Sequence, residues 1–315
     1  MTLLQFLEIP APAFPAVPPA AAADTLRPSV FRVGRMLLAE SRPPVQIVFL
    51  LRLVAFAAAV DGVGRLAGTG LLGLAGWSMI WMSVYVFNGV SDVDADRRNG
   101  SGRPIASGRL PVGTAAQAAV LLAVTGLGLC ALCSSRLTVL GLAGLLIGWR
   151  YSAGRAPLKA TTGGIALAAG SGVLLCYAAG VAIAGRSAGA ATVAFGIAEA
   201  AWLGLCAATK DFSDVEGDRL TGRRTWPIVF GDRVARRLVA LASGSLAAVF
   251  AALALLSGGG LAVAAATAAV GGVALSVAVL CSPATGNRAA RRRPYRTLMV
   301  TQYAVNVTLL ISPLA

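Results

Sequence analysis

The chain has 315 residues, of which 57% are hydrophobic and 13% are charged, and its mean hydropathy is +0.76. This composition excludes an ordinary soluble domain. The net charge of +14 would suit nucleic acid, but basic loops on one side of a membrane give the same sum, so we expect a lipid bilayer and no nucleic acid as partner. The chain has no histidine, which excludes imidazole catalysis and leaves carboxylates as the expected ligands of a hard metal ion.

The N-terminal part of the chain differs from the rest. Residues 1–27 are rich in Pro and Ala and carry little charge, so we expect a disordered tail. Residues 28–44 place apolar side chains and arginines at helical spacing, which predicts an amphipathic helix on the membrane surface. Pro43 and Pro44 are expected to break this helix, and residues 45–315 form the predicted transmembrane domain.

Apolar runs of about 20 residues, long enough for an α-helix to cross a bilayer, follow one another along this domain. They predict an all-α membrane protein with roughly nine transmembrane helices in a bundle. The predicted spans are residues 45–64, 70–91, 113–133, 137–152, 163–184, 190–210, 235–256, 258–281 and 297–314.

The basic residues support this order of spans. If the N-terminus lies inside, 23 of the 27 Lys and Arg fall on the inner side, three fall on the outer side and Arg52 lies within the first span. One missing or extra helix would scramble this distribution, which follows the positive-inside rule. It predicts a cytoplasmic N-terminus and a C-terminus outside. The preference for Arg over Lys, with abundant Ala and Gly, indicates a bacterial cell membrane.

Seven of the 13 acidic residues fall in two short runs, residues 88–96 and 210–218, which both lie on the predicted cytoplasmic side. Spacing of three or four residues places on one helix face Asn88, Asp92 and Asp96 in the first run, and Asp211, Asp214 and Asp218 in the second. Asp94 and Glu216 point elsewhere. Carboxylates clustered at a membrane edge predict a site for Mg²⁺ that bridges to a diphosphate. The alternative is that they are solvated charges at helix ends.

Two features within the predicted spans indicate a cavity beneath the acidic runs. Trp77, Trp81 and Tyr85 lie four residues apart on the face of the first run, where they would line an apolar cavity and stabilise a carbocation. Helix packing is the alternative for these rings. Glu199 is a charged residue about three turns before Asp211, a depth that suits the far end of such a cavity.

Basic residues flank both runs. The loop Arg-Pro-Ile-Ala-Ser-Gly-Arg begins at Arg103, and a second basic loop between the runs carries Tyr151 and ends at Lys159. Their cations are positioned to offset diphosphate charge, whereas most of the remaining arginines are expected to contact anionic lipid.

Together these motifs resemble the UbiA superfamily of intramembrane prenyltransferases. The resemblance starts near Arg42 and rests on four motifs in order: Asn-x-x-x-Asp-x-x-x-Asp, Arg-Pro-Ile-Ala-Ser-Gly-Arg, Tyr-Ser-x-x-x-x-Pro-Leu-Lys and Lys-Asp-x-x-Asp-x-Glu-Gly-Asp-Arg. It implies a nine-helix bundle around a chamber that opens sideways to lipid. The sequence departs from the family pattern at Gly89, where many members have Asp, and at the additional Asp94.

The resemblance also implies roles for single residues. The Mg²⁺ ligands would be Asp92, Asp96, Asp211, Asp214 and Asp218, and Lys159 and Tyr151 join them as expected catalytic residues. The residues expected to contact the substrate are Asn88, Arg103 and Lys210 from the resemblance, and Tyr85, Trp81 and Glu199 from their positions beneath the acidic runs.

Three functions are compatible with these features. The leading interpretation is Mg²⁺-dependent transfer of a prenyl group from a prenyl diphosphate to an acceptor, most often an aromatic ring. The alternative enzyme is a terpene cyclase, in which a double bond of the prenyl chain attacks the allylic cation. A cation or lipid transporter is disfavoured, because it predicts acidic groups near the bilayer midplane whereas these cluster at one edge.

Overall fold

The structure, a computed structural model, describes residues 29–62, 64–98 and 100–311, so the predicted tail at 1–27 lies outside the described residues. This part of the chain is all-helical, and its only strand-like pairing is an isolated bridge between Thr161 and Arg224. Nine of its helices have 17 or more residues: α3 (Pro43–Asp61), α4 (Thr69–Ser91), α6 (Val112–Cys133), α7 (Ser135–Ser152), α8 (Thr162–Ala184), α9 (Ala190–Cys206), α12 (Asp232–Leu256), α13 (Gly259–Cys281) and α15 (Arg293–Ile311).

Seven segments among the described residues are long and apolar enough to cross a membrane. They are Pro43–Asp61, Thr69–Ser91, Val112–Cys133, Thr162–Ala184, Ala190–Ser213, Asp232–Leu256 and Gly259–Cys281. Helices α7 and α15 have similar lengths but are more polar, since both carry arginines and α15 also carries amides. The chain is therefore an integral membrane protein, while the count of nine spans stays a prediction.

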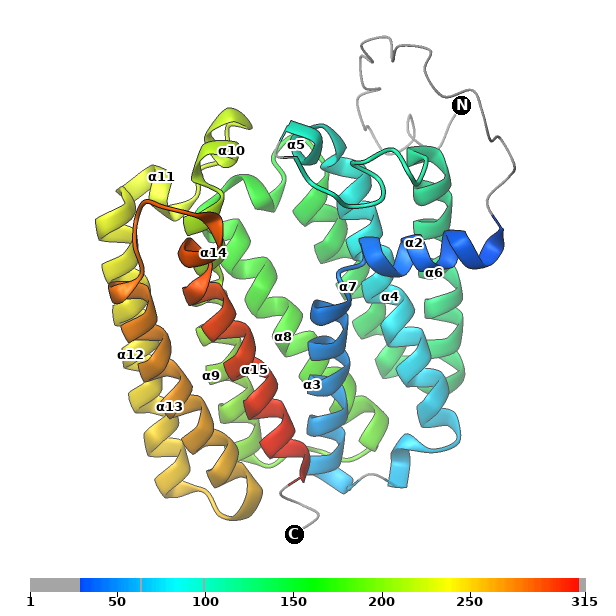
Figure 1. The fold of residues 1–315 in the computed structure, drawn as a ribbon. Helices are drawn as coiled ribbons and strands as arrows, with labels where there is room; N and C mark the ends of the chain where they lie inside the picture. The colour runs from blue at the N-terminus through cyan, green and yellow to red at the C-terminus, as the bar shows by residue number, and fades with distance from the viewer. Residues whose placement is uncertain (1–28, 63, 99, 312–315) are drawn as a thin grey trace.

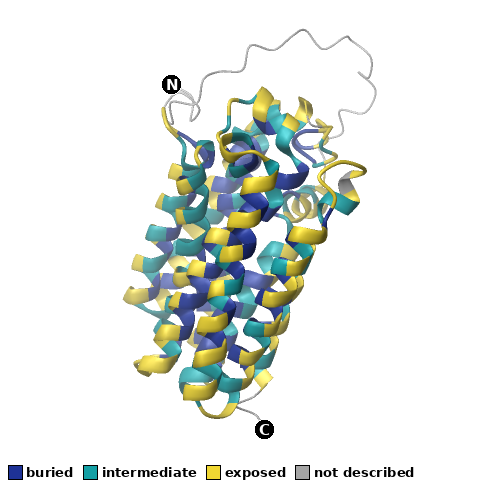
Figure 2. Ribbon diagram, turned by 90° about the vertical axis from the view of Figure 1, so that its left-hand side faces the viewer, coloured by how far each residue is buried: buried dark blue, intermediate teal, exposed yellow. Residues whose placement is uncertain are grey.

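The helices lie side by side in a single bundle, with exposed residues along its outer faces (Figures 1 and 2). Many of the exposed side chains are large and apolar, such as Leu121 on α6, Leu142 on α7 and Val270 on α13. Exposing these apolar side chains to water would be unfavourable, whereas lipid tails provide an apolar environment for them. Within the bundle, α4 and α6 approach closely at Gly76, where an added Cβ would lie 2.7 Å from the Gly126 carbonyl oxygen.

One end of the bundle carries most of the short elements (Figure 1). These are α2 (Val30–Glu40), α5 (Val93–Arg98), α10 (Val215–Leu220), α11 (Trp226–Phe230) and α14 (Arg288–Arg291). Helix α2 runs across this end at a steep angle to α3 (Figure 1). The change of direction occurs at Arg42, which adopts a left-handed φ of 59° before Pro43 begins α3. Both acidic runs thus lie at the same end, although the side of the membrane stays a prediction.

A chain of polar side chains connects three helices inside the bundle. Arg52 on α3 donates to the Gln302 side chain on α15, whose amide nitrogen donates to Glu199 Oε2 on α9 at 3.0 Å. All three side chains are buried, at 1% exposure or less. Arg52 and Glu199 each have other buried polar atoms without a hydrogen-bond partner in the described residues. The hydrogen bonds to Gln302 therefore stabilise both charged groups.

We expect Gln302→Leu to destabilise the bundle. The change preserves volume but leaves Arg52 and Glu199 without the amide that they share, which should lower the free energy of unfolding by about 3 kcal/mol. Thermal unfolding in detergent measures the loss. Thr267→Val is the control, because that hydroxyl donates to the backbone of its own helix on α13; an equal loss in both variants would contradict the assignment.

Candidate active site

The first acidic run lies across a break between two helices. Helix α4 ends at Ser91 and α5 begins at Val93, so Asp92 occupies the junction. Asn88 Nδ2 donates to Asp92 Oδ2 at 3.2 Å and to Ser152 Oγ on α7 at 3.3 Å. Asn88 and Asp92 therefore share a face as predicted. The expectation of one continuous helix through the run is wrong, because Asp96 belongs to α5.

Two cations meet at Asp92. Lys159 Nζ lies 2.8 Å from Asp92 Oδ1, and Arg223 Nη2 lies 2.9 Å from the same oxygen. Arg223 Nη1 lies 3.4 Å from Asp218 Oδ1 in the second run. One guanidinium group thus joins the two acidic runs, which no sequence spacing indicated.

The backbone holds these cations next to each other. The Arg224 amide donates to the Ala160 carbonyl at 2.9 Å, within the isolated bridge that pairs Thr161 with Arg224. Arg223 directly precedes this bridge in one segment, and Lys159 lies two residues before it in the other. The bridge therefore aligns both cations toward Asp92.

The second acidic run lies on two short elements, the 3₁₀ helix η3 (Ala207–Ser213) and α10. Asp211 and Asp218 are buried at 5% exposure, and Asp214 Oδ1 accepts a hydrogen bond from Ser213 Oγ at 3.0 Å. Lys210 is half-buried and close enough to Asp218 to affect it electrostatically. A regular α-helix through this run was expected, and the 3₁₀ segment corrects that expectation.

The two runs differ in electrostatic balance. Burial raises the pKa of Asp92, but Lys159 and Arg223 outweigh burial and hold that pKa below its usual range. Burial lowers the pKa of Lys159, and Asp92 offsets only part of this effect. The pKa of Asp218 is raised, chiefly by burial, although Arg223 and Lys210 oppose the shift. The neighbouring cations therefore outweigh burial at Asp92 but not at Asp218.

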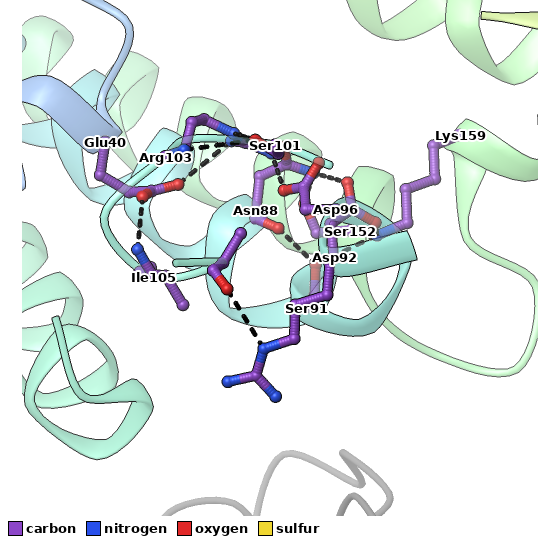
Figure 3. A network of polar contacts seen from close by, with 12 residues as sticks. Glu40, Asn88, Ser91, Asp92, Asp96, Ser101, Arg103, Ile105, Ser152 and Lys159 are labelled. Carbon is purple, nitrogen blue, oxygen red and sulfur yellow. Dashed lines mark hydrogen bonds and ion pairs between the residues drawn. The ribbon is translucent and has the colours of Figure 1, made fainter. Parts of the chain in front are cut away.

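Asp96 belongs to a network that includes a residue missed by the sequence analysis (Figure 3). Arg103 Nη2 pairs with Asp96, and Arg103 Nη1 lies 3.1 Å from Oε1 of Glu40, the last residue of α2. Glu40 is fully buried, and its Oε2 accepts the Ile105 amide at 3.0 Å. The departure at Gly89 was the available signal, because a missing side chain leaves room for another group.

The aromatic side chains pack against α3. The Phe49 ring lies 4.5 Å from Trp81 and 5.9 Å from Tyr85, and Trp77 lies 6.0 Å from Trp81, all between ring centroids. Arg42 lies 5.5 Å above the Tyr85 ring. Both indole nitrogens are buried without a hydrogen-bond partner among the described residues. The rings pack as the alternative interpretation held, and the cavity beneath the acidic runs stays a prediction.

Two further predicted site residues are Tyr151, at the margin of the carboxylates, and Glu199, which lies apart from them. Tyr151, near the end of α7, is half-buried and close enough to Arg223 to affect it electrostatically. Glu199 lies in the buried polar chain with Gln302 and Arg52. Asp94 and Glu216 are exposed.

The acidic side chains suit a hard cation by their chemistry. No group of three or more carboxylate, thiol or imidazole side chains in the described residues is arranged as a metal site, because cations join the carboxylates instead. Every donor is nevertheless a carboxylate oxygen, the ligand that Mg²⁺ prefers. Asp211 Oδ2 is buried and accepts no hydrogen bond from the described residues. That buried oxygen fits a bound cation.

These features define an all-helical integral membrane protein with two acidic runs joined by basic side chains at one end of the bundle. Residues 48–300 match the model of the UbiA prenyltransferase family. The chain belongs to this family, as the resemblance implied.

Solved structures with a similar fold come from the same family. A UbiA homolog from Archaeoglobus fulgidus bound to GPP and Mg²⁺ has a TM-score of 0.68 and 20% identity, over 87% of this chain and 99% of that one; the same values hold for its complex with DMAPP and Mg²⁺. A digeranylgeranylglyceryl phosphate synthase has a TM-score of 0.65 and 18% identity, over 89% and 98% of the two chains. A UbiA homolog from Aeropyrum pernix K1 has a TM-score of 0.64 and 14% identity, over 89% and 98%. Comparison with curated proteins found no match.

We expect Arg223→Gln to weaken the connection between the acidic runs. Asp92 and Asp218 would face each other with one cation fewer, which should lower the free energy of unfolding by about 2 kcal/mol. The loss should be larger at low than at high salt, since it is electrostatic. Thermal unfolding at two ionic strengths measures it, with the exposed neighbour Arg224→Gln as control. A loss that is independent of salt would speak against the ion-pair assignment.

Proposed function

We propose that the chain is a Mg²⁺-dependent prenyltransferase that moves a prenyl group from a prenyl diphosphate to an acceptor within the membrane. The observation that carries this proposal is that two acidic runs meet at one end of an apolar bundle, where Arg223 contacts both Asp92, 131 residues before it, and Asp218. Such an end can hold a charged diphosphate while the prenyl chain remains among apolar side chains. The charge distribution favours the cytoplasmic side of a bacterial cell membrane.

The carboxylates of both runs would hold the metal. The proposed Mg²⁺ ligands are Asp92, Asp96, Asp211, Asp214 and Asp218, and Asn88 would help to orient Asp92 through the hydrogen bond between them. When bound, Mg²⁺ neutralises the charge that develops on the departing diphosphate. The complexes of the Archaeoglobus fulgidus homolog with Mg²⁺ and either GPP or DMAPP support this proposal.

The basic side chains would bind the diphosphate itself. Lys159 and Arg223 already converge on one oxygen of Asp92, Arg103 pairs with Asp96, and Lys210 lies near Asp218. Hydrogen bonds from cations to phosphate oxygens strengthen as the carbon–oxygen bond breaks and its electron pair moves to the diphosphate. The half-buried Tyr151 completes the proposed margin of the site.

The apolar part of the site would protect the allylic cation. Trp81 and Tyr85 lie on the helix that leads to Asn88, and their rings would stabilise a cation on a prenyl chain that enters beside them. Exclusion of water prevents hydrolysis of that cation. An aromatic acceptor would attack it, forming a carbon–carbon bond and then losing the ring proton.

A terpene cyclase on the same fold is the second candidate. Glu199 favours it, because a cyclised carbocation ends the reaction by losing a proton to a base. Glu199 Oε1 is buried without a hydrogen-bond partner among the described residues and would serve as that base. Incubation with prenyl diphosphates of several lengths, with and without aromatic acceptors, separates the two candidates. Cyclic hydrocarbon formed without acceptor would replace the transferase proposal by the cyclase.

We expect Asp92→Ala and Asp214→Ala each to abolish Mg²⁺-dependent release of diphosphate, because each removes a proposed metal ligand. Colorimetric detection of diphosphate measures the loss, which should exceed 100-fold, or about 3 kcal/mol. Asp94→Ala and Glu216→Ala are matched controls from the same runs, since both side chains are exposed. Retained turnover in Asp92→Ala and Asp214→Ala would refute the metal assignment.

We expect Lys159→Met to raise KM for the prenyl diphosphate by about 10- to 100-fold, because a charge-assisted hydrogen bond contributes about 1.5–3 kcal/mol. Steady-state kinetics over a range of prenyl diphosphate concentrations measures the change. Arg155→Gln, an exposed cation of the same loop, is the control. Equal effects of the two substitutions would show that only the net charge of the loop matters.

A further inference from the structure

We propose that Glu40 is a positioning residue of this site, because its carboxylate, at the end of α2, fixes Arg103 in front of Asp96. The inference rests on the proposed function. It makes α2, which lies outside the bundle of long helices, part of the site that binds the prenyl diphosphate.

Glu40 is a buried carboxylate that contacts the loop carrying Arg103 in two places. It is 0% exposed, and an isolated buried carboxylate is costly unless hydrogen bonds or positive charge compensate it. The Ile105 amide donates to Oε2 at 3.0 Å, and Ile105 follows Arg103 by two residues in the same loop. Glu40 therefore holds the backbone of the loop and the Arg103 side chain at once (Figure 3).

Arg103 is divided between two carboxylates. Its Nη2 pairs with Asp96, while Nη1 lies 3.1 Å from Glu40 Oε1 without the alignment of a hydrogen bond. The contact with Glu40 is thus electrostatic, and Nη1 itself is buried, while the Arg103 side chain as a whole keeps 17% exposure. A phosphate oxygen is the chemistry that an accessible guanidinium next to a carboxylate site fits.

The first acidic run is built to admit Glu40. A Cβ added to Gly89 would lie 2.4 Å from Glu40 Oε1, which is closer than real atoms approach. Gly89 follows Asn88 in the last turn of α4, so the run itself leaves the space that Glu40 fills. The left-handed turn at Arg42 and the start of α3 at Pro43 fix the direction from which Glu40 arrives.

The physical consequence is that Glu40 keeps Arg103 ordered before the substrate binds. With Gln at position 40 the Ile105 hydrogen bond survives, but the charge that holds the guanidinium disappears. Arg103 then has Asp96 as its remaining carboxylate and more side-chain freedom to lose on binding. Binding of the diphosphate should weaken, whereas the chemical step should change little.

We expect Glu40→Gln to raise KM for a prenyl diphosphate about tenfold with kcat within about twofold of wild type, the pattern of lost uniform binding. The effect should vanish in the Arg103→Gln background, because Glu40 acts through Arg103. Gly89→Ala should have the same phenotype and should add little in a Glu40→Ala background, where the Cβ has no carboxylate to displace and meets the flexible end of the Ile105 side chain at 3.1 Å. Gly34→Ala on the exposed face of α2 is the control, since nothing lies within 4 Å of its added Cβ.

Equilibrium binding of a non-hydrolysable prenyl thiodiphosphate to the purified variants in detergent gives a readout that does not depend on turnover. The same tenfold weakening is expected there, with a thermal unfolding midpoint close to that of wild type. Unchanged binding in Glu40→Gln, or an equal loss of binding with and without Arg103, overturns the inference. A wild-type chain that neither binds nor consumes any prenyl diphosphate overturns the proposed function instead.

Discussion

The structure of this protein depends on the cations and hydrogen bonds that compensate the negative charge buried at one end of its apolar bundle. Removing carboxylates from water costs more than the net stability of most proteins unless cations or hydrogen bonds replace the lost hydration. Arg223 satisfies this requirement for two runs at once, since it contacts Asp92 and Asp218. The backbone bridge at Arg224 and the placement of Lys159 follow from the same need. Helix packing brings the runs to one end, and the shared cation decides how they face each other.

The long helices were predictable because lipid imposes a minimum length on each apolar run. The ends of the helices were less predictable, because spacing rules assume a regular α-helix. Helix α4 stops at Ser91, and after Cys206 at the end of α9 the chain continues as a 3₁₀ helix. Both breaks fall at the acidic runs, where side-chain contacts with distant loops outweigh local helix propensity. The sequence thus indicated the end of the bundle at which both acidic runs lie, but not the backbone form that presents them.

The contacts that join distant elements were the part that the sequence could not supply. Arg223 was one of several arginines in a basic loop, and nothing in its spacing relates it to Asp92. Gln302 is uncharged, so it gave no signal that it connects Arg52 to Glu199. Glu40 belonged to the polar face of a surface helix, a position in which most carboxylates are solvated. Each of these partners is set by tertiary packing, which a single sequence does not specify.

The position of Glu40 has a practical consequence for where this protein can be shortened. By hydropathy the membrane part begins at α3, so a chain that starts at Pro43 would keep every long helix and would look complete. It would nevertheless lack the carboxylate that lies against Gly89 and faces Arg103. In such a chain Arg103 would have Asp96 as its carboxylate partner and would lose the contact with Glu40. The contacts of the candidate site therefore begin in α2, before the boundary that hydrophobicity suggests.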